Sequence, residues 1–418
     1  MNDAFKKARP ILERLEAAGH EAYFVGGSIR DEVLGLPLHD VDIATSAYPE
    51  EVQKLFPKHF DVGLEHGTVM VWYAGETYEI TTFRSEDTYT DYRRPSHVTF
   101  ISSLKEDLKR RDFTMNALAM DKNGKLIDYF NGVDDIYNAC IRAVGLADER
   151  FEEDALRMMR AVRFSGQLSF DIEPATFAAL KKHAPLLEKI AIERVTQEFN
   201  KLWQGFRWQK GLYYLLKGEL ALHIPLPFEI FQGFPKMLTA MGTTSLPKPD
   251  FAWALAAFLG TEKQEEESML AALKALNRDF KMSKASGQEQ AAYATCLLAA
   301  KREEAAWRTL LFTYGFETVQ TVVNFIEREA REEAPWALAS PALSTEKLQA
   351  LNQSLPIHSR QDLAINGHDI MAYFPDLPKQ MIGQYLDRAL DRVLYERVEN
   401  ERQAILTSLA DGEEAGPF

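Results

Sequence analysis

Asp40 and Asp42 are two acidic residues whose spacing points to chemistry. They follow a β-rich run, residues 21–25, that stops at Gly26-Gly27. Glycines let the backbone turn sharply and approach a ligand closely, and Ser28 can cap a following helix whose first N–H groups can hold phosphate. Side chains two apart on a strand point the same way, so both carboxylates are expected on one face. Two carboxylates beside a phosphate-binding turn suit Mg²⁺ held between protein oxygens and nucleotide phosphates.

The alternative is an ordinary turn followed by a solvated acidic strand, and for the aspartate pair alone that is the simpler interpretation. The glycine turn ahead of the pair favours the metal site. The chain has neither a Gly-x-x-x-x-Gly-Lys-Ser/Thr run nor a Gly-x-Gly-x-x-Gly run after this strand, so the usual phosphate motifs do not apply. Glu79, on a later predicted strand, is either a third carboxylate over the metal or an ordinary outward side chain.

The composition limits the class of protein. The chain has 418 residues, 46% of them hydrophobic, which is enough for a large core and several domains. Its net charge of -14 and pI of about 5.3 argue against a generally basic nucleic-acid coat but allow a local basic groove. Cys140 and Cys296 are expected to be free, buried thiols. No signal peptide and no apolar run of about 20 residues is present, so we expect a cytoplasmic protein without membrane spans.

Strand and helix signals interleave up to about residue 140. A helix is predicted over residues 4–18, and two strands, over residues 67–73 and 76–84, are joined at Gly75. Residues 85–98 are polar and lack a helix or strand period, which predicts a loop, either mobile beside the site or plain surface. After residue 145 amphipathic helices dominate and no strand signal remains. The pattern predicts an α/β domain with a mixed sheet followed by an all-α remainder.

A basic stretch, residues 109–119, is a weaker chemical signal. Arg111 can contact a triphosphate, and Asp112 and Asn116 can hydrogen-bond a ribose. A basic helix start is common in proteins, so this stretch alone specifies no site. Among the later helices, Arg207, Lys210 and Lys217 are candidate phosphate contacts, for which an ordinary amphipathic helix is the simpler interpretation.

A predicted helix over residues 152–164 carries the second informative pattern. Asp154 and Arg157 are three apart and are expected to share a helix face, which Arg160 and Arg163 continue. The alternative is a solvated local ion pair. Cytosine and adenine both present an amine donor beside a ring-nitrogen acceptor, which a carboxylate and a guanidinium match. Guanine and uracil present the reverse order and would leave buried groups unpaired, at about 1–3 kcal/mol each. If this pair reads a base, it can accept both CTP and ATP and reject GTP and UTP; a solvated ion pair is the commoner meaning of such a spacing.

Together these motifs resemble those of the bacterial class II tRNA nucleotidyltransferases, the CCA-adding enzymes of the DNA polymerase β superfamily. The resemblance is dense over residues 20–210. The motifs that carry it are Gly26–Asp31 with Asp40–Asp42, Arg111–Ala117, Gly132–Asp135, Glu153–Arg157, and Glu193-Arg194-Val195 with Glu198. One departure is Asp87, where the family's mobile loop usually has glycine. The loop has its full length, which favours addition of all three nucleotides.

The resemblance implies a DNA polymerase β-like nucleotidyltransferase head followed by all-α neck, body and tail domains, at residues 1–145, 146–208, 209–320 and 321–418. It implies Mg²⁺ on Asp40 and Asp42. The partners would be CTP, ATP and the acceptor and TψC arms of tRNA, with the oligomeric state (monomer or homodimer) left open. The nucleotide-binding residues it implies are Gly26, Gly27, Ser28, Arg30, Arg111, Asp112, Asn116, Glu153, Asp154, Arg157, Arg160 and Arg163.

The implied reaction is attack of the tRNA 3′-hydroxyl on the α-phosphate of CTP twice and then of ATP once, with release of pyrophosphate. Three alternatives stay open. An A-adding partner enzyme and a bacterial poly(A) polymerase share the head motifs, and neither would add C. A catalytically silent tRNA-binding protein with the same fold would bind tRNA without adding nucleotides.

Overall fold

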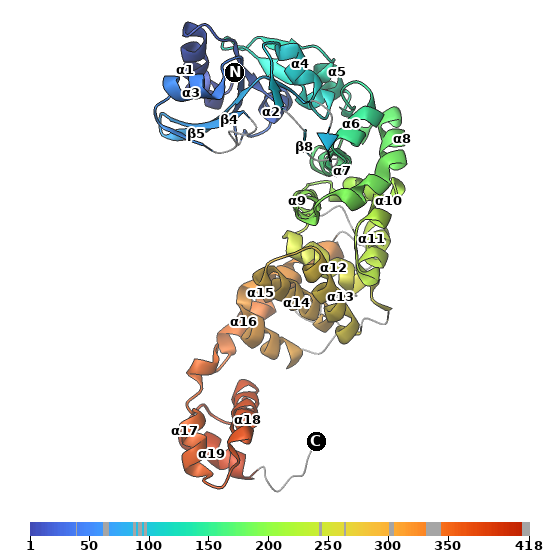
Figure 1. Ribbon diagram of the computed structural model, residues 1–418. Helices are drawn as coiled ribbons and strands as arrows, with labels where there is room; N and C mark the ends of the chain where they lie inside the picture. Colours follow the sequence, from blue (N-terminus) through green and yellow to red (C-terminus); the bar gives the residue numbers. More distant parts are fainter. Residues whose placement is uncertain are drawn as a thin grey trace. The chain divides into compact units, whose positions relative to one another are not determined.

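The computed structural model describes residues 1–38, 40–61, 67–86, 89–90, 94–95, 98–241, 245–262, 265–300, 305–331 and 344–411. The chain forms two compact units, Met1–Leu226 and Pro227–Phe418 (Figure 1). The four-part division into head, neck, body and tail is finer than this and stays a prediction. None of the described helices is long and apolar enough to cross a membrane.

The first unit begins with a seven-stranded mixed sheet, as the sequence predicts. Strands β2 and β5 are parallel, and the other neighbouring pairs are antiparallel. The strand order is β11 (Leu126–Asp128), β10 (Leu118–Met120), β1 (Ala22–Val25), β2 (Asp42–Thr45), β5 (Glu76–Thr82), β4 (Thr68–Tyr73) and β3 (His59–Phe60).

Helices and apolar side chains cover the sheet. Helix α1 (Asp3–Ala17) confirms the helix predicted over residues 4–18, and α3 (Pro49–Leu55) follows β2. The Phe5 ring of α1 lies 4.9 Å from the Phe24 ring of β1. Val25, next along β1, points to the opposite face because side chains alternate along a strand. It joins a buried cluster with α4 (Leu104–Lys109) that includes Leu104, Leu108, Ala117 and Ala119.

Two loop predictions have different outcomes. The hairpin predicted at Gly75 is confirmed: β4 and β5 pair throughout, and Ala74 and Gly75 both have positive φ angles, as a tight two-residue turn requires. The prediction that residues 85–98 form a loop without strands is wrong. There β6 (Arg84–Glu86) pairs with β9 (Val98–Phe100), and β7 (Tyr89–Thr90) pairs with β8 (Arg94–Pro95). Asp87 and the predicted mobility of this loop lie outside the described residues.

Short helices and strands lead from the sheet into the helical part of the first unit. Two-residue strands β12 (Cys140–Ile141) and β13 (Asp171–Ile172) pair in parallel, so the prediction of no strand after residue 145 is wrong for β13. Two residues are too few to show a period of alternation. The remaining elements are α2 (Gly27–Leu34), η2 (Thr114–Asn116), α5 (Gly132–Tyr137), α6 (Ala147–Glu153), α7 (Leu156–Leu168), α8 (Pro174–His183), η3 (Ala184–Lys189), α9 (Ile192–Trp203), α10 (Trp208–Lys217) and η4 (Leu220–His223).

Within the described residues the second unit is built from helices. Helices α11 and α12 approach closely at Gly233, where an added Cβ would stand 1.9 Å from the Ala256 carbonyl oxygen. Cys296 is buried in α14, whereas Cys140 in β12 is only partly buried, and both are free thiols as predicted. The elements are α11 (Phe228–Ala240), α12 (Pro249–Gly260), α13 (Glu266–Asp279), α14 (Lys284–Ala299), α15 (Ala305–Arg331), α16 (Thr345–Ser354), η6 (Arg360–Asp362), α17 (Gly367–Tyr373), η7 (Lys379–Met381), α18 (Ile382–Leu394) and α19 (Arg402–Asp411).

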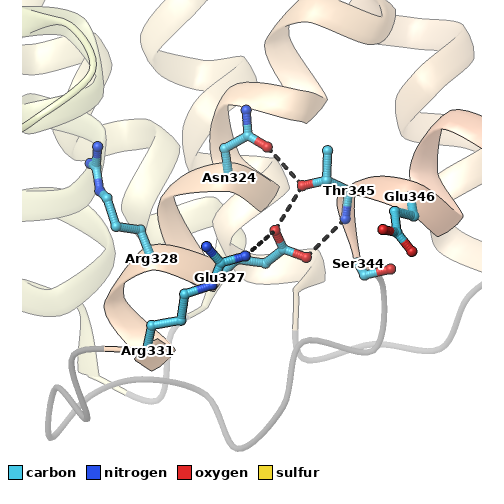
Figure 2. A pocket seen from close by; sticks show the side chains of 7 residues that line it. All are labelled: Asn324, Glu327, Arg328, Arg331, Ser344, Thr345 and Glu346. Atoms are coloured by element: carbon cyan, nitrogen blue, oxygen red, sulfur yellow. Dashed lines mark hydrogen bonds and ion pairs between the residues drawn. The ribbon is translucent and has the colours of Figure 1, made fainter.

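A polar cavity of about 670 Å³ lies where α15 ends and α16 begins (Figure 2). The Glu327 carboxylate joins the two helices there by accepting hydrogen bonds from the backbone N–H and the hydroxyl of Thr345, at 2.9 and 2.8 Å. The hydroxyl of Thr345 also lies 2.7 Å from Asn324 Oδ1. These bonds fix the start of α16 on α15.

Candidate active site

The glycine turn at the end of β1 has the geometry that the sequence suggests, with one change. Gly26 has φ +80° and ψ −141°, which L side chains rarely adopt, and precedes the first residue of α2, Gly27. The prediction that Ser28 caps α2 is wrong. Ser28 is the second residue of the helix, and its hydroxyl donates to the Val25 carbonyl oxygen at 3.2 Å. A glycine at the N-cap leaves the backbone of this turn open to a ligand.

Asp42 is the first residue of β2, beside this turn, and pairs with Val25. Asp40 is exposed and precedes the strand, so the expectation that both aspartates lie on one strand is wrong for Asp40. Asp42 is adjacent to Glu79 on β5, because Ile43 pairs with Ile80 in the parallel register. Burial raises the pKa of the Asp42 carboxyl, and the charges of Glu79 and Asp40 raise it further against the lowering effect of Arg111.

A bound cation would favour the charged form of these carboxylates, so their oxygen donors and charge fit Mg²⁺. In the part of the chain that the structure describes, no three His, Cys, Asp or Glu side chains gather closely enough to hold a metal ion. The protein would therefore supply the two aspartates, and nucleotide phosphates and water would supply the other oxygens. Glu79 as a third ligand gains no support from this geometry.

Arg111 reaches the turn from the end of α4. One of its terminal nitrogens, Nη1, lies 3.0 Å from the point where a Cβ on Gly26 would stand, and Asp42 Oδ2 lies 3.7 Å from that point. A cation, a carboxylate and an open backbone thus meet at one place, although they are up to 85 residues apart in the sequence. This arrangement can bind a phosphate chain and a metal ion together.

Asp112 is buried, and its carboxylate accepts hydrogen bonds from two other candidate site residues, Asn116 and Arg160. Its Oδ1 accepts from the Phe113 N–H at 2.8 Å and from Asn116 Nδ2 at 3.1 Å, and its Oδ2 accepts from Arg160 Nε at 2.7 Å. Arg160 Nη2 also lies 2.6 Å from Oδ2. A carboxylate has about four acceptor positions, so little capacity is left for a ribose hydroxyl. This pattern favours a supporting role for Asp112 in place of the predicted ribose contact. Despite burial, the charge of Arg160 and these hydrogen bonds lower the pKa of Asp112 to about 2.

Asn116 continues this chain of contacts to the glycine turn. Its Oδ1 accepts from Arg30 Nη1 at 2.8 Å, and Arg30 lies on α2, immediately after the turn. The guanidiniums of Arg30 and Arg160 lie 5.0 and 5.4 Å from the centre of the Phe164 ring. Arg163 lies 3.8 Å from the same ring, and its Nε donates to Glu198 at 2.5 Å. Arg30 of α2, Asn116 of η2, and Arg160 and Arg163 of α7 therefore belong to one connected network.

The predicted helix over residues 152–164 is broken at Asp154. Helix α6 ends at Glu153, Asp154 has extended φ and ψ angles, and α7 begins at Leu156. The expectation that Asp154 and Arg157 share one helix face is therefore wrong. Asp154 Oδ1 accepts the N–H of Leu156, the first residue of α7, at 3.0 Å. Both carboxylate oxygens also accept from Arg194 of α9, at 3.3 and 2.8 Å.

Arg157 has different partners from Asp154. Its Nη1 donates to Glu153 Oε2 at 2.5 Å and to the Arg150 carbonyl oxygen at 3.1 Å, and its Nη2 donates to the Arg110 carbonyl oxygen at 2.8 Å. Arg150 also pairs with Glu153. Each candidate base-reading side chain is thus held by its own set of contacts and oriented before a nucleotide arrives.

Part of this site was not anticipated from the sequence. Asp107 contacts Arg110 and Arg111 at the end of α4, and its spacing of three and four residues from two arginines is a helical ion-pair signal that could have identified it. Arg150, three residues before Glu153 on α6, carries the same kind of signal. Of the candidate phosphate contacts, Lys210 pairs with Asp171 at 2.8 Å, which gives it a structural partner, and Lys217 lies 5.1 Å from the Tyr213 ring.

Three features are typical of the nucleotidyltransferase class. They are an α/β head with a mixed sheet, a glycine turn beside two aspartates, and a helical remainder. Family models agree with this class along the chain. Residues 22–142 match a model described as the Poly A polymerase head domain, residues 169–227 match one for an RNA- and SrmB-binding site of polymerase A, and residues 246–409 match one for tRNA nucleotidyltransferase domain 2.

Whole-chain relatives narrow the class. The chain is 42% identical over 403 residues to the CCA-adding enzyme of Streptococcus mutans, covering 96% of each, and 42% identical over 405 residues to that of Streptococcus pyogenes, covering 96% of this chain and 95% of the relative. The structure of the Bacillus stearothermophilus CCA-adding enzyme in complex with CTP matches with a TM-score of 0.86 and 38% identity, over 99% of this chain and 98% of that one. The chain belongs to the family of CCA-adding enzymes, which are tRNA nucleotidyltransferases.

A more distant structure shares the fold. The Thermotoga maritima CCA-adding enzyme complexed with tRNA matches with a TM-score of 0.59 at 18% identity, over 98% of this chain and 95% of that one. The fold class and the family predicted from the sequence are confirmed.

Proposed function

We propose that this protein adds C, C and A in turn to the 3′ end of tRNA, using CTP and ATP and no nucleic-acid template. The observation that carries the proposal is the meeting of Gly26, Asp42 and Arg111 at one point, in a chain that is 42% identical to CCA-adding enzymes over nearly its whole length. Related structures were solved with CTP and with tRNA, which supports the same partners here.

Asp40 and Asp42 are the residues that would hold Mg²⁺. When bound, the ion would lower the pKa of the attacking 3′-hydroxyl and offset charge on the phosphates. The Arg111 guanidinium, next to the turn, is placed to bind the triphosphate with charge-assisted hydrogen bonds. The backbone of Gly26 and Gly27 leaves room for a phosphate to approach, and Arg30 is held beside it by Asn116.

Asp154 and Arg157 would choose the base. Asp154 accepts three hydrogen bonds in the structure, which leaves it an acceptor position for the exocyclic amine of cytosine or adenine. Arg157, held by Glu153, would donate to the adjacent ring nitrogen. Because neighbouring residues already hold both side chains, little conformational entropy is lost when the nucleotide binds. A guanine or uracil would oppose acceptor to acceptor and donor to donor.

The helical remainder would hold the tRNA. Its recognition would use the shape and backbone of the acceptor and TψC arms, since double-stranded RNA exposes little sequence information. We assign this task to the predicted body, residues 209–320, and tail, residues 321–418, and base selection to the neck, residues 146–208. We propose that the protein acts in the cytoplasm, because tRNA, CTP and ATP occur together there.

The test is incubation of tRNA that lacks its three terminal nucleotides with labelled CTP alone, ATP alone, and both. The proposal predicts two C additions with CTP alone and a complete CCA end with both nucleotides. An A-adding enzyme or a poly(A) polymerase would add no C, and a silent tRNA-binding protein would bind without adding either. Incorporation of A alone, or of nothing, would therefore contradict the proposal.

Two carboxylate variants test the metal assignment in the same assay. Asp42→Ala should abolish incorporation at any Mg²⁺ concentration, because it removes a ligand. Glu79→Gln is the matched control, since it removes a neighbouring charge from the same face of the sheet. It should retain incorporation. Full activity in Asp42→Ala would show that the metal assignment is wrong, and loss in Glu79→Gln would make Glu79 a third ligand.

A further inference from the structure

Asp107 is a buried carboxylate at the end of α4, and the proposed function gives it no role. Its side chain is 1% exposed. Its Oδ1 accepts from Arg110 Nε at 3.0 Å and Nη2 at 2.9 Å, and from the Arg84 backbone N–H at 3.3 Å. Its Oδ2 accepts a longer hydrogen bond from Arg111 Nη2, at 3.4 Å. One carboxylate therefore binds both arginines of this helix end.

The Arg111 side chain extends from Asp107 to the glycine turn. Nη2 faces Asp107, while Nη1 is the atom that lies 3.0 Å from the position of a Cβ on Gly26. The fork of a guanidinium is planar and rigid, so a contact that fixes one of its nitrogens also fixes the direction of the other. The orientation of Arg111 at the turn thus depends on where Asp107 stands.

The charges around Arg111 give Asp107 a second effect. Burial lowers the pKa of Arg111, and the charges of Asp107 and Asp42 act against that lowering. Among the described residues, Asp107 is the carboxylate within 4 Å of Arg111. The Arg111 guanidinium is largely but not fully buried, and without that partner it would be drawn to the other carboxylate nearby, Asp42. An Arg111–Asp42 pair would take from Asp42 the charge that a metal ion needs.

We infer that Asp107 is a positioning residue. It holds Arg111 at the glycine turn, ready for the triphosphate, and keeps it from pairing with Asp42. Burial alone would raise the pKa of Asp107, but the charges of Arg110 and Arg111 hold it below its ordinary value, so the carboxylate is charged at neutral pH. The inference rests on the proposed function, because it assigns to Arg111 the binding of the nucleotide's phosphates.

The first test is Asp107→Asn, which keeps the shape of the side chain and removes its charge. We expect KM for CTP and for ATP to rise by about tenfold alike, because one charge-assisted hydrogen bond to phosphate is weakened. Equilibrium binding of pyrophosphate should weaken by a similar factor, and binding of CMP should stay unchanged. A general loss of folding would affect CMP as much as pyrophosphate. Glu106→Gln is the matched control, since it removes an exposed carboxylate one residue earlier on α4.

A double-mutant cycle with Arg111→Ala separates positioning from a general structural role. If Asp107 acts through Arg111, Asp107→Asn should weaken pyrophosphate binding in the native chain and have no further effect in Arg111→Ala. Should Asp107→Asn fail to fold, the same cycle is run with Asp107→Glu, which keeps the charge and moves it. Equal losses in both backgrounds, or no loss in either, would overturn the inference. A native chain that binds pyrophosphate but incorporates no CMP would instead contradict the proposed function and leave this cycle measurable.

Discussion

Gly26 offers a quantitative test of the glycine turn. Its φ of +80° and ψ of −141° lie in a region that costs a residue with a Cβ about 1–3 kcal/mol. The methyl group of Gly26→Ala would also stand 3.0 Å from Arg111 Nη1 and 3.7 Å from Asp42 Oδ2. The substitution therefore strains the backbone and displaces the arginine that is proposed to bind the triphosphate.

Two separate effects follow from this geometry. For a unit of about 200 residues, a loss of 1–3 kcal/mol lowers the melting temperature of the first unit by roughly 2–12 °C. Displacing Arg111 removes a hydrogen bond to a charged group, which contributes about 1.5–3 kcal/mol. That loss should lower kcat/KM for both CTP and ATP by roughly 10- to 150-fold. The melting curve and the incorporation kinetics report the two effects independently.

Gly35 provides the matched control at the other end of the same helix. It follows the last residue of α2, has φ +67°, and has open space where a Cβ would stand. Gly35→Ala should lower the melting temperature through backbone strain and leave kcat/KM within about twofold of the native value. If Gly35→Ala lost as much activity as Gly26→Ala, or if Gly26→Ala kept native kcat/KM, the role given to the turn would be refuted.

Three further predictions concern Asp112, Arg157 and Cys296. The pKa of Asp112 falls from 3.8 to about 2 in the folded chain, so this carboxylate contributes about 2 kcal/mol of stability above pH 4 that is lost as the pH falls through 2. The free energy of unfolding, measured in urea, should fall by this amount between pH 5 and 2. In Asp112→Asn this part of the fall should be absent. Arg157→Ala should raise misincorporation of UMP and GMP relative to CMP by roughly 5- to 150-fold in single-nucleotide assays; unchanged discrimination would exclude Arg157 as a base reader. Because burial raises the pKa of Cys296 to about 12, alkylation at pH 8 should modify Cys140 first, and rapid labelling of Cys296 in the folded chain would contradict the burial described.

The sequence predicted those parts of the fold and site that have a local signature. Alternation of apolar residues and the glycines at 26 and 75 identified strands and turns correctly, because such signals depend only on neighbours along the chain. The two-residue strands β12 and β13 have no period and were missed. The mixed sheet order, in which β1 lies between β10 and β2, depends on long-range pairing that no single stretch determines.

The proposed base-reading residues show the same limit of sequence-based prediction more clearly. The types and spacing of Asp154 and Arg157 were enough to suggest a choice between bases. Their spacing suggests one helix face, whereas the helix breaks at Asp154, whose carboxylate accepts the Leu156 N–H and pairs with Arg194, forty residues later. These two contacts favour the break over a continuous helix, and the contact with Arg194 is visible only in the tertiary structure.

The position of Arg111 against Gly26 also required the structure. In the sequence, Arg111 is one of several basic residues at a helix end, and its distance from Asp40 and Asp42 depends on the fold. The structure brings one terminal nitrogen of Arg111 to the glycine turn and the other to Asp107.

The most direct test of the account measures product length on tRNA that ends at its discriminator base. With CTP alone the native chain should add two nucleotides and stop, and with CTP and ATP it should add three and stop. Asp42→Ala should add none under either condition while still binding the tRNA. Addition of A without C, continued addition beyond three nucleotides, or full activity in Asp42→Ala would contradict the account.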